Sequence, residues 1–187
     1  MARRTLAPKP PAATAPGCDD RAVTDPTGSP DAPNAVHRYR ARVAWSGSTA
    51  EGYEAYDRTH SASAPPADAA LRLASDPAFR GDPALLNPEQ LVLLAASSCQ
   101  LLSFLAVAAR ARLDVRSYED EAEAEMPEDD RPVRLTTITL RPRVVMGPGP
   151  TVDRVRHLLE VAHRECFIAN SLRTEVRIEA DVVVAPA

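Results

Sequence analysis

Hydrophobic and polar positions alternate from His37 onward, which is the spacing of a half-buried β-strand. Apolar residues occupy every second position up to Trp45, and arginines stand between them. A Ser-Gly-Ser turn then separates this strand from two further short strands, which we expect around residues 51–58 and 68–73. The N-terminal part of the domain is therefore predicted to be a small sheet.

The chain before this sheet has a different character. Residues 1 to about 35 are rich in Pro, Ala, Gly and Asp and lack hydrophobic periodicity. Such a segment cannot bury enough apolar surface to offset its ordering entropy, so we expect a disordered tail followed by one domain over 36–187. Cys18 lies in this tail, and we assign no function to either.

Asn87 and Pro88 begin the most strongly predicted element. Asn is a favourable N-cap, Pro suits the first helical position, and Glu89 and Gln90 follow in the first turn. About 20 residues after them are apolar on nearly every side, which predicts a helix buried on most of its surface. The serines and Gln100 within this run argue against a membrane span.

The second half alternates between strand and helix patterns. Residues 115–126 and 133–146 read as strands joined by an acidic hairpin loop, and a final strand is expected over 173–184. Between them, Thr151 is a good N-cap for a helix whose apolar spacing extends to Cys166. Strand runs separated by two helices predict an α+β domain and not a doubly wound parallel sheet.

Composition narrows the class of protein. The chain has 187 residues, 44% hydrophobic content and a net charge of −4, which suits a single globular domain. No basic cluster suggests nucleic acid, and no segment was expected to be long and apolar enough to span a membrane. Arg3 and Arg4 are not followed by an apolar stretch, so a secretory signal is not expected and the cytoplasm is the predicted location.

Three cysteines carry the candidate chemistry. An odd number in a reducing compartment argues against a structural disulfide framework. Cys99 and Cys166 both lie in apolar helical patterns, where a cysteine also serves simply as a small hydrophobic residue. Two thiols on packed helices can nevertheless approach within disulfide range. A metal site through His163 and Cys166 is a weaker alternative, since no full ligand set is present, and no cofactor is indicated.

A reactive cysteine needs a neighbouring cation or helix N-terminus to stabilise its thiolate. Arg58 and Arg80 precede the first helix and are the candidate cations, although each also suits an ordinary surface position. Glu89 lies ten residues before Cys99, about 15 Å along a straight helix, and cannot touch it. Either an arginine bridges that gap or a second chain contributes to the site, which favours a dimer.

Particular segments resemble a known family. NPEQLVLLAASSC places Asn-Pro-Glu at a helix start with a cysteine ten positions after the glutamate, and AHRECFIANSL places a second cysteine in the next helix. This combination, over about residues 37–185, resembles the OsmC/Ohr superfamily of organic hydroperoxide resistance proteins. YDRTH, FRGDP and HRECFIANS further resemble a branch of OsmC-like proteins.

The resemblance implies a fold and an activity. The implied fold is an intertwined homodimer with antiparallel sheets wrapped around two central helices. The implied activity is reduction of organic hydroperoxides, with Cys99 attacking the peroxide, Cys166 forming the disulfide and a dithiol, possibly a lipoyl protein, restoring the thiols. Glu89 would orient a catalytic arginine, which is Arg80 by preference or else Arg58.

Two other functions remain open from the sequence. A stress-associated binding module with negligible peroxide turnover would keep the same fold and cysteines. Acyl transfer with Cys99 as nucleophile and His163 as base is weaker, because no oxyanion motif is evident.

Overall fold

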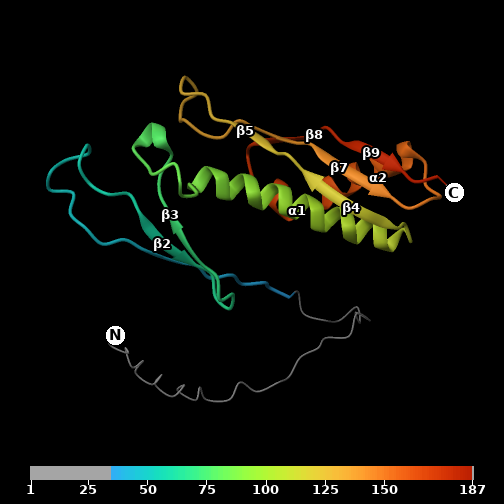
Figure 1. Ribbon diagram of the computed structural model, residues 1–187, viewed down its shortest axis with the longest axis horizontal. Coiled ribbons are helices and arrows are strands. Elements are labelled where there is room, and N and C mark those ends of the chain that lie inside the picture. The colour runs from blue at the N-terminus through green and yellow to red at the C-terminus, as the bar shows by residue number, and fades with distance from the viewer. Residues whose placement is uncertain (1–34, 187) are drawn as a thin grey trace, which may run out of the picture. The chain divides into compact units, whose positions relative to one another are not determined.

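A computed structural model describes residues 35–186, so Cys18 and nearly all of the expected disordered tail lie outside the described residues. From Tyr39 onward the described chain forms one compact unit. Strands and helices are interspersed, which confirms the α+β class (Figure 1). In chain order the elements are β1 (Arg42–Ala44), β2 (His60–Ser63), β3 (Ala70–Leu73), the 3-10 helix η1 (Pro77–Phe79), α1 (Pro88–Arg110), β4 (Val115–Asp120), β5 (Glu123–Glu125), β6 (Thr137–Leu140), β7 (Pro142–Met146), α2 (Val152–Glu165), α3 (Phe167–Ser171), β8 (Glu175–Ile178) and β9 (Asp181–Val184).

The strands form three three-stranded sheets, in the orders β1-β2-β3, β4-β7-β9 and β5-β6-β8. Two pairs, β6 with β8 and β7 with β9, are parallel, so the expectation of purely antiparallel sheets is wrong for them. Parallel neighbours need a long crossover connection, and here α2 and α3 supply it. The three long strands expected in the second half are each divided into two, and their halves belong to different sheets.

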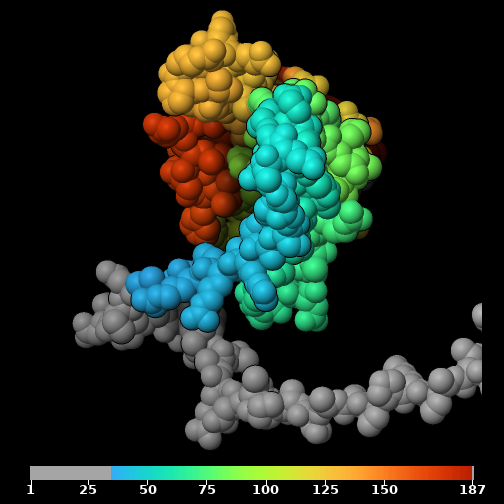
Figure 2. All heavy atoms as spheres, turned by 90° about the vertical axis from the view of Figure 1, so that its left-hand side faces the viewer, coloured from blue at the N-terminus to red at the C-terminus, as the bar shows by residue number. Residues whose placement is uncertain are grey.

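The N-terminal sheet differs most from the prediction. Residues 51–58 form turns rather than a strand, and β2 begins only at His60. The Arg58 guanidinium explains this, because it donates to the carbonyl oxygens of Tyr53 and Tyr56 and lies over both rings, folding the segment back on itself. The chain from Tyr39 to β3, blue to green in Figure 2, faces the viewer and is largely exposed.

Helix α1 begins as predicted. The Asn87 side chain accepts from the Gln90 N–H at 2.8 Å, and the Gln90 side chain accepts from the Asn87 N–H at 3.1 Å, which completes a capping box.

The expected burial of α1 on most sides is wrong for the single chain, since Leu94 and Leu102 are 54% and 63% exposed. By length and composition alone α1 is also able to cross a membrane, contrary to the sequence-based expectation, although core helices of soluble proteins meet the same criterion.

Helix α2 begins at the predicted cap, where Thr151 accepts from the Arg154 N–H at 3.2 Å. Its buried residues Val155, Leu159 and Ala162 follow the helical spacing expected from the sequence. They join Phe104 of α1 and residues of β7 and β9 in the main core cluster, and Figure 1 shows α1 running along this part of the molecule. The core thus lies between the two helices and the β4-β7-β9 sheet.

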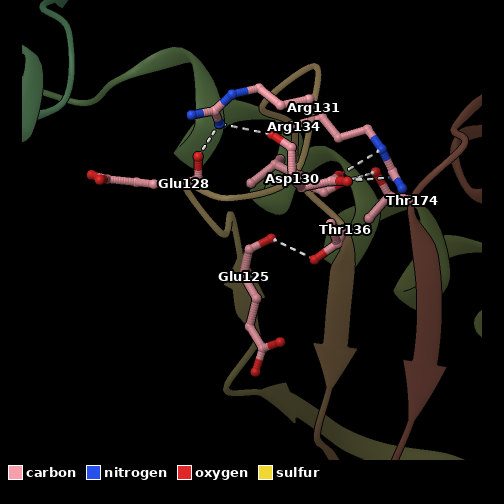
Figure 3. A network of polar contacts seen from close by, with 8 residues as sticks. Glu125, Glu128, Asp130, Arg131, Arg134, Thr136 and Thr174 are labelled. Carbon is pink, nitrogen blue, oxygen red and sulfur yellow. Dashed lines mark hydrogen bonds and ion pairs between the residues drawn. The ribbon is translucent and has the colours of Figure 1, made fainter.

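The acidic hairpin between β5 and β6 is confirmed, because these strands pair antiparallel. Figure 3 shows the polar contacts that hold its loop, in which Arg134 pairs with Asp130 at 3.2 Å. At the base of the hairpin the Thr136 hydroxyl donates to the Glu125 carbonyl oxygen at 3.3 Å. Within the acidic run, Asp130 is the residue that makes this ion pair, so its carboxylate helps to hold the loop.

Candidate thiol site

Cys99 and Cys166 come together from different elements. Cys99 lies in the middle of α1 and is partly exposed, whereas Cys166 is 1% exposed. The sequence placed Cys166 within the second helix, but the structure places it at the break between α2 and α3. Its backbone there is extended, and its sulfur accepts from the Ala169 N–H at 3.5 Å, so Cys166 caps α3.

Hydrogen bonds to Cys99 favour its thiolate. Burial works against the charged sulfur, but the Ile168 N–H, the Cys166 thiol and the Phe167 N–H donate to it and outweigh burial. Ser103, one turn further along α1, adds a hydroxyl donor. These hydrogen bonds therefore hold the pKa of Cys99 below its ordinary value.

Cys166 shows the opposite behaviour. Burial and, to a smaller extent, the neighbouring Cys99 raise the pKa of the Cys166 thiol to about 11, against the lowering effect of the Ala169 N–H. One sulfur is thus disposed to be a thiolate while the other keeps its proton and donates it in a hydrogen bond. A thiolate nucleophile beside a second thiol is an arrangement from which a disulfide can form.

A hollow of about 530 Å³ opens beside Cys99. Its walls are mostly apolar, and Phe167 stands 82% exposed at its edge. Two of its lining residues, Arg110 of α1 and Glu165 of α2, form an ion pair at 2.6 Å. The lining residues are Cys99, Leu102, Ser103, Ala106, Arg110, Arg164, Glu165, Phe167 and Asn170.

The other three predicted residues do not join the thiols within the described chain. Arg58 is held by the tyrosine rings and carbonyls described above, and Arg80 pairs with Glu54. Glu89 lies in the first turn of α1 and lines a separate hollow with Asp76 and Gln90. One Glu89 carboxylate oxygen is buried without a hydrogen-bond partner among residues 35–186.

Sequence reasoning missed the groups that tune Cys99. Ser103 stands four residues after Cys99, a spacing that places both on one helix face and was available as a signal. The N–H groups of Phe167 and Ile168 had no such signal, because they depend on the break at Cys166.

The described residues do not support the alternative metal site. Residues 35–186 contain no group of three or more His, Cys, Asp or Glu side chains able to hold a metal ion. The Nδ1 atom of His163 is buried and has no hydrogen-bond partner in this part of the chain. Burial, with a smaller contribution from the charge of Arg164, lowers the pKa of His163.

Comparisons with known proteins agree with this fold and these sequence segments. Residues 81–181, which include both cysteines, match the family described as OsmC-like protein. A structure of an OsmC-like protein of unknown function from Vibrio cholerae is 30% identical, with a TM-score of 0.71, and the match covers 78% of this chain and 100% of that one. A search of curated proteins finds no match.

More distant structures share the fold alone. An organic hydroperoxide resistance protein OsmC from Legionella pneumophila is 20% identical, with a TM-score of 0.60 and coverage of 80% of this chain and 99% of that one. The organic hydroperoxide resistance protein OhrB of Bacillus subtilis is 15% identical, with a TM-score of 0.57 and coverage of 79% and 99%.

Proposed function

Because the chain belongs to the OsmC-like protein family, we propose that it is a thiol-dependent peroxidase that reduces organic hydroperoxides through Cys99 and Cys166. The observation that carries the proposal is the contact between these two thiols, whose pKa values are shifted in opposite directions. Similar folds in proteins named for organic hydroperoxide resistance add support at the level of the family.

In the first step the Cys99 thiolate attacks the distal, hydroxyl-bearing oxygen of ROOH. An S–O bond forms as the O–O bond breaks, the alkoxide takes a proton and leaves as the alcohol ROH, and Cys99 becomes a sulfenic acid. Hydrogen bonds from the Phe167 and Ile168 N–H groups favour the thiolate that this step consumes.

In the second step the Cys166 sulfur attacks the sulfenic sulfur of Cys99. An S–S bond forms as the S–O bond breaks, and the Cys166 proton leaves with the hydroxyl group as water. A dithiol reductant, such as a lipoyl protein, then returns the pair to two thiols while its own sulfurs become a disulfide. A cytoplasmic location, where such reductants keep thiols reduced, remains a prediction.

The hollow beside Cys99 supports an organic substrate. Its volume is in the range of small-molecule sites, and Leu102, Ala106 and Phe167 offer apolar surface to an alkyl or aryl group. Hydrogen peroxide would gain nothing from these walls, so we expect it to react more slowly than cumene hydroperoxide.

A homodimer is part of the proposal. Glu89 and Cys99 are ten residues apart on one continuous helix, about 15 Å, so Glu89 cannot act on Cys99 of its own chain directly. The exposed leucines of α1 favour a partner that covers them. In the dimer, Arg80 held by Glu89 would approach a Cys99 thiolate at the interface.

A binding module with little turnover is the second candidate. It is favoured by one observation, namely that Arg58 and Arg80 both have other partners in the described chain. In that case the thiols would persist without an arginine to bind peroxide.

The deciding experiment is mass spectrometry of the reduced full-length protein after one equivalent of cumene hydroperoxide, with hydrogen peroxide in parallel. We expect a Cys99–Cys166 disulfide that forms faster with the organic peroxide, and no peroxide consumption by Cys99→Ser. Unreacted thiols in the wild type would overturn the peroxidase and leave the binding module.

A further inference from the structure

Gln100 follows Cys99 directly and is fully buried, with 0% of its surface exposed. Its amide Nε2 donates to the Leu159 carbonyl oxygen of α2 at 3.1 Å. Burying an amide in an apolar core costs free energy unless its hydrogen bonds are made. An amide at this place in an otherwise apolar core therefore requires an explanation.

The contact has a consequence for the neighbouring thiols. Cys99 and Gln100 are adjacent on α1, but their partners are seven residues apart. Cys99 contacts Cys166 at the end of α2, whereas Gln100 bonds to Leu159 within α2. Seven residues of helix span about 10 Å. Two contacts this far apart restrict both sliding and rotation of α2 against α1. The Gln100 amide therefore fixes the position of Cys166 relative to Cys99.

Strand β4 contacts α1 on either side of Gln100. Ser97, one turn before Gln100, donates to Asp120 at 2.5 Å, and Phe104, one turn after it, lies 6.0 Å from the Tyr118 ring. Tyr118 and Asp120 are two residues apart on one face of β4. These two contacts lie one turn before and one turn after Gln100, so β4 crosses α1 at the level of the amide.

Both remaining polar atoms are unpaired. Gln100 Oε1 and the Tyr118 hydroxyl oxygen are buried without hydrogen-bond partners among residues 35–186. An amide oxygen accepts and a phenol donates, so their chemistry is complementary. Burial of Tyr118, with the charges of Asp120 and of a Cys166 thiolate, raises the pKa of the phenol and keeps it a neutral donor.

We propose that Gln100 is a positioning residue that holds Cys166 in register with Cys99 for disulfide formation, and that the Tyr118 phenol, which is not bonded to it in this structure, can turn to donate to Oε1. The inference rests on the thiol pair of the proposed peroxidase forming a disulfide. It does not depend on peroxide being the oxidant.

The test measures the Cys99–Cys166 disulfide at equilibrium with reduced and oxidised dithiothreitol. In this exchange two protein thiols are oxidised as the cyclic dithiothreitol disulfide is reduced, so no peroxide is involved. Gln100→Met keeps the length and volume of the side chain but removes the hydrogen bond. We expect it to lower the equilibrium constant for the protein disulfide roughly five- to tenfold, the size of one lost hydrogen bond.

Ser97→Ala is the matched control. It also removes a hydrogen bond from α1 to its surroundings, but that bond goes to β4 and not to α2. The control is expected to lower the melting temperature and to leave the equilibrium constant within twofold of the wild type. Equal effects of the two substitutions on the constant would overturn the proposal, because they would reflect only general loosening.

Tyr118→Phe provides a second, milder variant that removes one oxygen, and it carries the test if Gln100→Met does not fold. We expect it to weaken the disulfide two- to fivefold in the wild type and to have no further effect on Gln100→Met. If Tyr118→Phe has the same equilibrium constant for the disulfide as the wild type, Tyr118 has no part in positioning Gln100. If Gln100→Met has the wild-type constant, the proposal is overturned. If the protein forms the disulfide in this exchange but does not react with cumene hydroperoxide, the proposed peroxidase activity is wrong and the role of Gln100 is unaffected.

Discussion

The Cys166 thiol donates a hydrogen bond to the Cys99 sulfur from a break between two helices. That break also turns the N–H groups of Phe167 and Ile168 toward Cys99. A single local feature thus provides both the second sulfur and the donors that stabilise the first one as a thiolate. It also accounts for the lowered pKa of Cys99.

The pH dependence of alkylation should separate the two thiols. Because hydrogen bonds hold the pKa of Cys99 low, its thiolate should appear at lower pH than that of free cysteine, for which the pKa is about 8.5. Cys166, with a pKa of about 11, should react only at higher pH. Iodoacetamide labelling of the reduced protein, read by peptide mass spectrometry across pH 5 to 11, measures both; coinciding midpoints would contradict the assignment.

Replacing Cys166 should stop the reaction at the sulfenic acid. Cys166→Ser keeps a hydroxyl donor for Cys99, whereas Cys166→Ala removes the donor, so the alanine variant should show the higher Cys99 pKa and slower reaction with cumene hydroperoxide. In both variants dimedone should trap Cys99. The pair is its own control, and equal first-step rates would show that the Cys166 thiol does not assist Cys99.

The two candidate arginines should differ when each is replaced by glutamine. Arg80 is held by an exposed ion pair with Glu54, a weak type of contact, and can be recruited elsewhere. Arg58 is fixed by two carbonyls and two rings. We expect Arg80→Gln to slow peroxide reduction at least tenfold with little loss of stability, and Arg58→Gln chiefly to lower stability. The reverse pattern in stopped-flow rates and thermal melts would assign the role to Arg58.

The cap of α1 should contribute more to stability than the cap of α2. Asn87 is 5% exposed, completes a capping box and also donates to Asp76 at 3.1 Å. Thr151 is exposed and makes one capping bond. Asn87→Ala should therefore cost about 1–2 kcal/mol and Thr151→Ala about 0.5–1 kcal/mol in the free energy of unfolding. Urea denaturation measures both, and a larger loss for Thr151→Ala would contradict this ranking.

The sequence alone determined the features that depend on neighbouring residues. Asn87, Pro88 and Gln90 specify where α1 begins, since a cap is made by side chains within one turn of the backbone groups they satisfy. Thr151 does the same for α2. The periodicity of the second half likewise identified an α+β class, and the spacing of Glu89 and Cys99 excluded direct contact between them.

Tertiary structure decided what depends on distant residues. The alternation in residues 133–146 and 173–184 shows which side chains share a face of a strand, but it does not show which strand lies beside it. The parallel pairs and the division of each long strand could therefore not be predicted from the sequence. In residues 51–58 the stacking of Arg58 on Tyr53 and Tyr56 overrode the strand pattern. The break at Cys166 is decided by packing in the same way, because the helical spacing continues through it, and only the folded chain brings the Phe167 and Ile168 N–H groups to Cys99.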